Sequence, residues 1–229
     1  MSSSKFNLRA WASNSPSLRA LTEQYKVAET KETVKVLGLC WNVGLDELSL
    51  CSKPEPVRTP VTKREILCYT SSIFDPLGLV TPVTITTKLL LQELWQDNVS
   101  WDIELNDTYQ LKWASIVADI SIASQQCFPR QCIPKLDPSA ATLHVFADAS
   151  PKAYGAAVYI HCGNHSSLLI SKSRVAPVKQ HTQPRLELMA AVIAARLGSF
   201  VVNSLNHTTD TFYWSDSQIV LSGSKVRRA

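Results

Sequence analysis

The sequence predicts an α/β (α+β) fold in three parts, and three observations support this prediction. Apolar residues alternate on either side of a turn near residues 34–51, as in a β-hairpin. Between residues 62 and 120 they recur at spacings of three and four, as in helices. From about residue 139, segments with strand and helix patterns follow in the order β-β-β-α-β, which indicates a mixed sheet with helices.

The first part, residues 1–52, is expected to contain a β-hairpin after a weakly helical stretch, LRALTEQY. In VKVLGLCWN the apolar residues from Val34 to Trp41 favour one strand. VGLDE then makes a turn, and LSLC returns as the second strand. The KPEPVRTP segment that follows has three prolines in eight residues and is expected to be a linker.

The middle part, residues 53–138, is expected to be helical. Thr62 and Glu65 form a capping-box pattern, which predicts a helix from Lys63 to about Ile73. The DPLG segment at 75–78 ends it, and a second helix is expected over 84–96. A third is expected to begin after residue 106 or 107. The proline-rich CFPRQCIPKLDPSA segment is expected to be a connector.

The last part, residues 139–229, is expected to be an α/β unit. ATLHVFADAS alternates apolar and polar residues and predicts a strand, and YGAAVYIH and SLLISKSRVA predict two more. A helix is expected from Arg185 to about Val202, followed by a strand at TFYWSD. One face of this sheet is expected to be partly uncovered.

Composition excludes some classes of protein. The chain has 229 residues, 45% of them hydrophobic, and a net charge of +4, which suits a globular protein and permits a nucleic-acid partner. It has no uninterrupted apolar stretch of roughly 20 residues and no signal-peptide core, so no membrane partner is expected. The six cysteines include no C-x-x-C pair. We expect them to be reduced and mostly buried, in a cytoplasmic (intracellular) protein.

Three carboxylates are the candidate metal ligands. Asp148 and Asp216 each follow a predicted strand, and Glu187 lies in the first turn of the helix between them in sequence. Small residues three, four and seven positions after Glu187 would let this helix approach the sheet. Carboxylates at one sheet edge favour a hard cation, Mg²⁺ or Mn²⁺. Taken singly, each fits a structural role as well, in turn capping or at the helix dipole.

At these residues the sequence resembles a known family. Three segments are similar, in amino-acid sequence and in order, to the first three acidic motifs of ribonuclease H: FADAS, RLELMAAVIAARL and WSDSQIVL. Upstream segments resemble the polyprotein of BEL/Pao-type LTR retrotransposons, a region sometimes labelled as a Pao peptidase: NLRAWASNS, VKVLGLCWN and TKREILCYTSSIFDPLGLVTPVTITTKLLLQELW. The resemblance implies that residues 1–52 end a reverse transcriptase palm, that 53–138 form a helical thumb or connection, and that 139–229 begin a ribonuclease H-like domain.

The resemblance also implies a mechanism and partners. Two Mg²⁺ (or Mn²⁺) ions would act on the RNA strand of an RNA/DNA hybrid, with Asp148 bridging both ions and Glu187 and Asp216 on opposite sides. The 2′-hydroxyl would mark the strand to be cut. Gln218, Gln183 and Ser150 would contact the hybrid. The rest of the retroelement polyprotein would be a further partner.

Two expected features are absent from the sequence. No Asp-Asp pair occurs, so the chain is not expected to polymerise DNA alone, and no Asp or Glu follows Asp216 to serve as the fourth acidic residue of ribonuclease H. We therefore expect a truncated ribonuclease H-like domain with weak or no hydrolysis. One alternative is a non-catalytic remnant that binds nucleic acid or protein. An aspartic peptidase is disfavoured, because no Asp-Thr/Ser-Gly triplet is present.

The middle part offers further candidate contacts with the hybrid. Trp95 and Trp101 would stack on bases or pack in a core, and Trp113 is expected in the core. Lys63, Arg64 and Lys88 would grip the hybrid or be plain surface charges.

Overall fold

The computed structural model describes residues 10–29, 31–51, 60–133, 140–179, 181–205 and 210–223. It divides into two compact units, residues 1–52 with 124–131 and residues 53–123 with 132–229. The expected boundaries at 52/53 and 138/139 lie outside the described residues. The assignment of the three segments to palm, thumb or connection, and ribonuclease H-like domain therefore stays a prediction.

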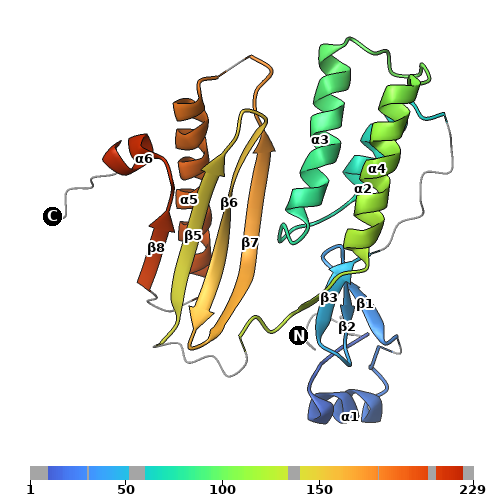
Figure 1. Cartoon of the computed structure of the whole chain (residues 1–229). Helices are drawn as coiled ribbons and strands as arrows, with labels where there is room; N and C mark the ends of the chain where they lie inside the picture. Colours follow the sequence, from blue (N-terminus) through green and yellow to red (C-terminus); the bar gives the residue numbers. More distant parts are fainter. Residues whose placement is uncertain are drawn as a thin grey trace, which may run out of the picture. The chain divides into compact units, whose positions relative to one another are not determined.

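The first unit is a small antiparallel sheet with one helix (Figure 1). The sheet order is β1-β2-β3-β4, and the elements are α1 (Pro16–Gln24), β1 (Thr33–Val36), β2 (Leu39–Asn42), β3 (Glu47–Leu50) and β4 (Cys127–Pro129). The expected hairpin is confirmed as β2 and β3. The expectation of one strand from Val34 to Trp41 is wrong, because Leu37 and Gly38 have φ of +49° and +89° and form a tight turn between two strands.

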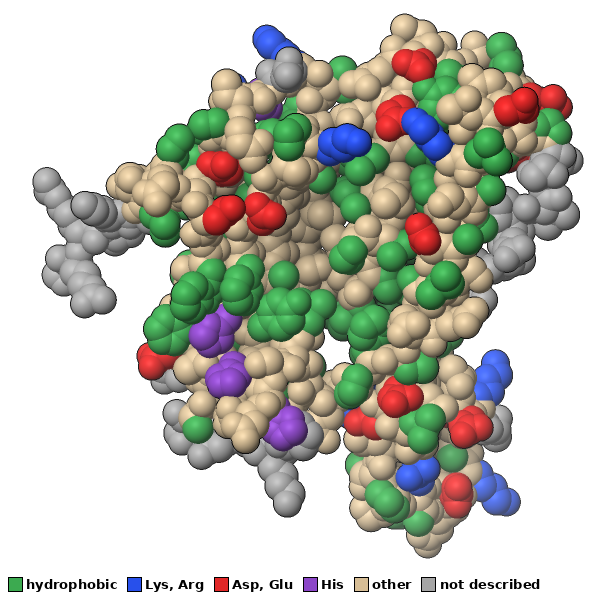
Figure 2. All heavy atoms as spheres, viewed as in Figure 1, with side chains coloured by type: hydrophobic (Ala, Val, Ile, Leu, Met, Phe, Trp, Pro, Cys, Tyr) green, Lys and Arg blue, Asp and Glu red, His purple; other side chains and the backbone are tan. Residues whose placement is uncertain are grey.

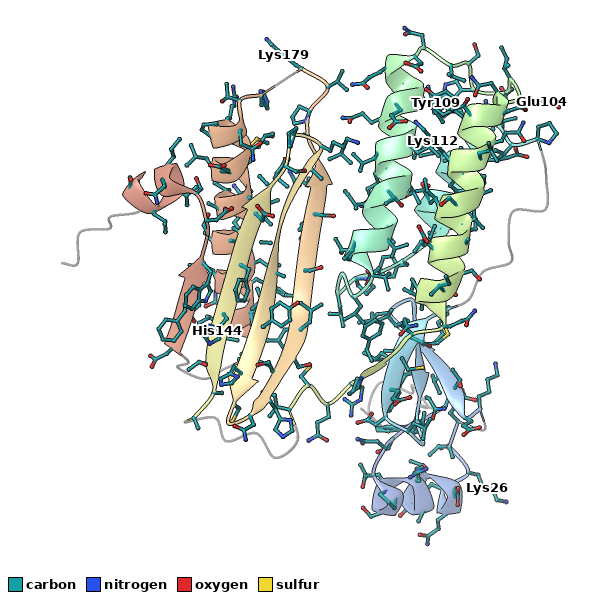
Figure 3. The ribbon with its side chains drawn as sticks, in the orientation of Figure 1. Lys26, Glu104, Tyr109, Lys112, His144 and Lys179 are labelled. Carbon is teal, nitrogen blue, oxygen red and sulfur yellow. A yellow bond between two sulfur atoms is a disulfide. The ribbon has the colours of Figure 1, made fainter. Side chains whose placement is uncertain are left out.

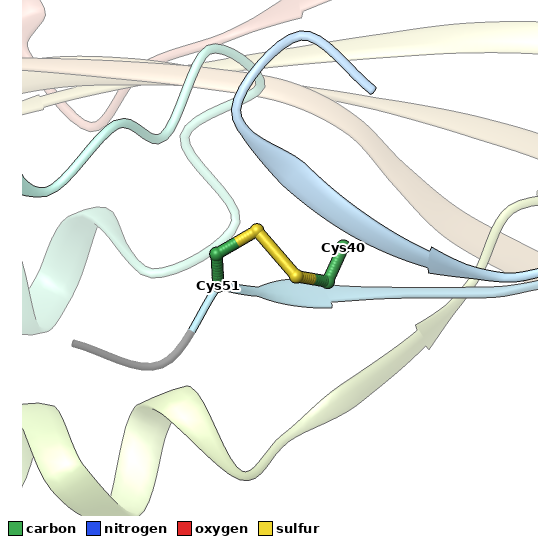
Figure 4. The surroundings of a disulfide bond; sticks show 2 residues. All are labelled: Cys40 and Cys51. Atoms are coloured by element: carbon green, nitrogen blue, oxygen red, sulfur yellow. A yellow bond between two sulfur atoms is a disulfide. The ribbon is translucent and has the colours of Figure 1, made fainter. Parts of the chain in front are cut away.

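A disulfide in the first unit corrects the expectation of six reduced, mostly buried cysteines. Cys40 and Cys51 are bonded to each other, with Cα atoms 5.1 Å apart (Figure 4). The register explains this pairing, since Cys40 lies opposite Ser49 and Cys51 follows two residues later on the same face. The four cysteines outside this disulfide are exposed or half-buried.

The helical part of the second unit follows the predicted pattern. Its helices are α2 (Lys63–Ser72), α3 (Thr81–Gln96) and α4 (Asp107–Ser124). The capping box is confirmed, because Thr62 accepts from the Glu65 amide and Glu65 accepts from the Thr62 amide at 2.8 Å. α3 begins three residues earlier than expected, with a proline in its first turn. The buried core of this part is Val61, Ile66, Leu90, Leu91, Leu94, Leu105 and Trp113.

Exposed polar contacts join α3 to α4. The Tyr109 hydroxyl donates to Asp97, and this hydrogen bond raises the pKa of Tyr109 to about 12. Lys112 pairs with Glu93 on the same two helices. Figure 3 labels Tyr109 and Lys112 on α4. These contacts add to the buried packing, which carries most of the stability of a helix pair.

Lys63 lies inside the helical part, which contradicts both sequence interpretations of it. Its side chain is 2% exposed, and its Nζ donates to the carbonyls of Leu94 and Val99 at 3.3 and 3.1 Å. The ammonium lies 3.7 Å from the Trp95 ring centroid and 5.0 Å from that of Trp101. These two indoles therefore enclose a buried cation.

The remaining part of the second unit is a mixed sheet of order β7-β6-β5-β8 (Figure 1). Its elements are β5 (Thr142–Ala149), β6 (Ala153–Cys162), β7 (His165–Val175), α5 (Gln183–Leu205), β8 (Asp210–Trp214) and α6 (Gln218–Gly223). β5 is antiparallel to β6 and parallel to β8, so the predicted order and the mixed sheet are confirmed. The α5 helix begins two residues earlier than expected.

The core of this part lies between the sheet and α5. Leu143, Val145 and Val158 are fully buried on the inner face, and Leu186 and Ala190 meet them from the helix. α5 is the one helix in the described residues that is long and apolar enough to cross a membrane, and a third of that window is buried. Its packing against the sheet accounts for this apolar character.

The outer face of the sheet is partly uncovered in the described residues, as expected. Phe146, Phe212 and Trp214 are 45%, 46% and 49% exposed. His144, labelled on β5 in Figure 3, stacks on Phe212 and Trp214 with ring centroids 5.4 and 5.9 Å apart. Figure 2 shows hydrophobic and histidine side chains gathered over this face.

The segment between α2 and α3 is bonded to the edge strand β7. The Ser171 amide donates to the Leu77 carbonyl at 2.9 Å, and the Ser171 hydroxyl donates to the Gly78 carbonyl at 2.6 Å. Gly78 has a φ of +69°, and a Cβ added there would lie 2.2 Å from the Ser171 carbonyl oxygen. This contact therefore requires glycine for its backbone conformation and for the close approach.

Replacing Gly78 with alanine is expected to lower the free energy of unfolding by about 2–3 kcal/mol, because the left-handed conformation and the clash both cost energy. Gly163→Ala is the matched control, since Gly163 has a φ of +61° with nothing within 4 Å of its added Cβ. It should cost only about 1 kcal/mol. Urea denaturation measures both, and equal effects would show that the Ser171 contact contributes nothing.

Candidate carboxylate site

Asp148 lies near the end of β5, and Asp216 lies two residues beyond the end of β8, the neighbouring parallel strand. The last registered pair of β5 and β8 is Phe146 with Trp214, and each aspartate follows its strand residue by two positions. Both side chains are exposed. Asp148 Oδ1 accepts from the Ala149 amide at 2.7 Å. The strand register therefore brings these two aspartates to the same end of the sheet, as the sequence predicted.

Glu187 reaches the same end of the sheet from α5. It is the fifth residue of the helix rather than part of its first turn, and it is half-buried. Ala190 and Ala194, three and seven residues on, are 1% and 3% exposed. Small side chains at these places let α5 approach the sheet closely.

A serine that the sequence interpretation missed holds Glu187. The Ser217 hydroxyl donates to Glu187 Oε2 and also accepts from the Val220 amide at 3.3 Å. Ser217 is 5% exposed and precedes α6, so it acts as the N-cap of that helix. The WSDS segment contains Ser217 beside Asp216, but the contact of Ser217 with α5 depends on tertiary packing.

Three carboxylates lie toward one corner of the sheet, and none of them belongs to an ion pair in the described residues. Residues 140–223 contain four acidic residues, and one of them, Asp210, lies at the opposite end, opposite Thr142. Figure 2 shows three acidic side chains gathered where β5 ends and α6 begins. The ion pairs in the described residues involve none of these carboxylates. In the same residues, however, no group of three or more His, Cys, Asp or Glu side chains is arranged to hold a metal ion.

The three predicted nucleic-acid contacts differ in their surroundings. Gln183 donates from its amide to the Ala149 carbonyl at 2.7 Å, so it braces α5 against the end of β5. Gln218 is exposed at the first position of α6. The Ser150 hydroxyl lies within the turn after β5, where it donates to the Ala153 carbonyl at 3.1 Å and accepts from the Ala153 amide. Gln218 is the most available of the three for a ligand.

Comparisons with known proteins bear on the family and the fold of this chain. A family model described as the Pao retrotransposon-like RNaseH-like domain matches residues 62–217, which is more than half of the chain. No curated protein matches the sequence. A solved foamy viral protease-reverse transcriptase in complex with dsDNA is similar over 93% of this chain and 46% of that chain, with 16% identity and a TM-score of 0.51.

A second foamy viral structure, the protease-reverse transcriptase dRH in complex with ds DNA, is similar over 89% of this chain and 35% of that chain. Its identity is 15% and its TM-score is 0.44. The chain thus spans less than half the length of either solved chain. The first of these similarities supports the mixed α+β fold, and the RNaseH-like description comes from the family model.

Proposed function

Because the chain belongs to the family of Pao retrotransposon-like RNaseH-like domains, we propose that it binds an RNA/DNA hybrid through the carboxylate end of its sheet. In the intact polyprotein this end would hold two divalent ions for hydrolysis of the RNA strand. The observation that carries the proposal is that Asp148 and Asp216 lie at one end of the sheet, where Ser217 binds Glu187, and that none of the three belongs to an ion pair in the described residues. The similar foamy viral structure was solved with dsDNA, so a nucleic-acid duplex is the first ligand class to test.

The donor set suits a hard cation in its chemistry. Asp148, Glu187 and Asp216 offer only oxygen ligands, which Mg²⁺ and Mn²⁺ prefer. They do not form a ready metal-binding group, so binding requires the side chains to move toward one another. Bound divalent ions supply Lewis-acid stabilisation of the charge that develops on a phosphodiester during hydrolysis.

The neighbouring residues of the chain would position the carboxylates and the nucleic acid. Ser217 keeps Glu187 directed toward the corner through its hydroxyl. Gln183 fixes the start of α5 to the end of β5. Gln218, exposed beside Asp216, would donate to the minor groove of the hybrid, where the 2′-hydroxyl distinguishes the RNA strand.

Manganese binding tests the metal proposal. We expect the chain to remove free Mn²⁺ from solution in an electron paramagnetic resonance titration, and Asp148→Asn to weaken this binding by about tenfold or more. Asp210→Asn is the matched control, because Asp210 is exposed at the opposite end of the sheet. Equal binding by wild type and both variants would rule out a metal site at Asp148.

A non-catalytic nucleic-acid binder is the second candidate function. Its specific support is the absence, in the described residues, of three metal-type side chains arranged as ligands. Hybrid binding that is the same with Mn²⁺ and with a chelator would favour this candidate.

A further inference from the structure

A groove of about 750 Å³ runs along the side of α5 in the second unit. α5 packs mainly on β5 and β6 and little on β7, against which α3 packs instead. The segment between α2 and α3, bonded to β7 through Ser171, forms the opposite wall. None of the residues that line the groove belongs to the carboxylate site.

The sheet side of the groove is partly basic. Lys172 and Arg174 lie opposite Ala156 and Tyr154 in the register, and these two partners are buried beneath α5. Residues directly opposite each other on paired strands point to the same face. Lys172 and Arg174 therefore belong to the inner face of the sheet, where a core would ordinarily place apolar residues.

The helix side of the groove is an apolar ridge. Leu188, Val192, Arg196 and Phe200 are spaced four residues apart along α5 and all line the groove. The three apolar members are 46%, 49% and 60% exposed. Rows with this spacing are the ridges by which helices pack against one another. α6 packs on α5 but does not line this groove, whereas Thr81, Thr84 and Lys88 of α3 do.

The charged side chains that line the groove are mostly cations. Five cations line it, namely Lys88, Lys172, Arg174, Arg185 and Arg196. None of them belongs to an ion pair in the described residues. Asp75 is the one acidic residue among those that line it, and its two oxygens already accept from the amides of Leu79 and Val80 at 2.9 Å. The groove therefore attracts an anionic ligand.

We propose that this groove binds an acidic amphipathic helix of a partner protein. An apolar ridge with a basic rim complements a helix that presents apolar residues at spacings of three and four between acidic ones. The ridge from Leu188 to Phe200 spans roughly 18 Å, about three helical turns. A nucleic-acid duplex would meet the cations but would leave the apolar ridge without a partner. A second copy of this chain would bring the same positive charges to the contact.

A fluorescein-labelled helical peptide of about 16 residues tests the proposal on the full chain. It carries leucines on one face and glutamates elsewhere, and the control peptide has the same composition with the leucines spread around the helix. We expect a dissociation constant on the order of 10 μM for the first peptide and at least about tenfold weaker binding of the control. The double variant Arg174→Glu with Arg196→Glu should weaken binding by about tenfold or more, whereas Lys179→Glu, which lies outside the groove, should not.

Val192→Ala, a mild change on the ridge, keeps the test valid if the double variant fails to fold. This variant should weaken binding of the first peptide by about threefold while leaving the thermal unfolding of the protein unchanged. Equal binding of both peptides, or no binding at about 1 mM, would overturn the proposal. Displacement of the peptide by a single-stranded oligonucleotide that binds more tightly would also overturn it, since the groove would then be a nucleic-acid site.

Discussion

Replacing Lys63 with alanine is expected to lower the free energy of unfolding by about 3–5 kcal/mol. The ammonium of Lys63 satisfies two carbonyls, one at the C-terminal end of α3 and one just after it. It also lies against the rings of Trp95 and Trp101. Alanine would leave both carbonyls without this donor and open a cavity between the indoles.

Two control variants separate the causes of this loss. Lys63→Met keeps most of the volume but removes the donors and the charge, so it should cost about 1–3 kcal/mol. Lys88→Ala removes an exposed lysine from α3 and should cost less than about 0.5 kcal/mol. Urea denaturation followed by tryptophan fluorescence measures all three variants. A Lys63→Ala variant as stable as Lys88→Ala would contradict the buried-cation interpretation.

The second large effect is expected at Asp46 in the first unit. Its carboxylate accepts from Trp41 Nε1 at 2.9 Å, from Asn14 Nδ2 at 3.0 Å and from the Arg130 guanidinium. It thereby links the β2–β3 turn to β4 and to residue 14. Asp46→Ala should destabilise this unit by about 2–4 kcal/mol, because the charge-assisted hydrogen bonds are lost together.

Hydrogen exchange of peptides that cover residues 39–50 measures this effect locally. Asp46→Asn is the matched variant, since Asp46 has a φ of +57°, a conformation that asparagine adopts readily. It keeps the shape and removes the charge, and it should cost about half as much as alanine. Unchanged exchange in Asp46→Ala would show that the network does not hold the turn.

The same carboxylate predicts a pH dependence. Hydrogen bonding to Arg130 is the main cause that lowers the pKa of Asp46 below its ordinary value of 3.8. A lowered pKa in the folded state means that the stabilisation is present above pH 3.8 and is lost as the pH falls through the folded value. The stability difference between wild type and Asp46→Asn should therefore be constant near neutral pH and shrink below pH 3.8. A difference that grows on acidification would contradict this sign.

Local signals predicted much of the fold. The capping box at Thr62 and Glu65 and the alternation in ATLHVFADAS depend on neighbouring residues, and both predictions are confirmed. The sequence does not predict the Leu37–Gly38 turn, because the apolar residues on both sides of it favour a single continuous strand. The buried position of Lys63 could not be predicted, since it depends on two indoles that approach from more than 30 residues away.

The candidate site was predictable in its placement and not in its detail. The strand register brings Asp148 and Asp216 to one sheet end, although Asp148 lies inside β5 rather than after it as predicted. The contact between Ser217 and Glu187 depends on how α6 meets α5, which no local pattern specifies. Whether the carboxylates converge on a metal depends on side-chain rotation, which lies beyond any sequence pattern.

We propose that the carboxylate end of the sheet binds an RNA/DNA hybrid with the help of divalent metal. The most direct measurement is the fluorescence anisotropy of a labelled hybrid with Mn²⁺ and with a chelator, for wild type, Asp148→Asn and Asp210→Asn. We predict tighter binding with Mn²⁺ for wild type and Asp210→Asn, and no gain from Mn²⁺ for Asp148→Asn. Binding that is the same with and without metal in all three proteins would contradict the claim and identify a metal-independent binder.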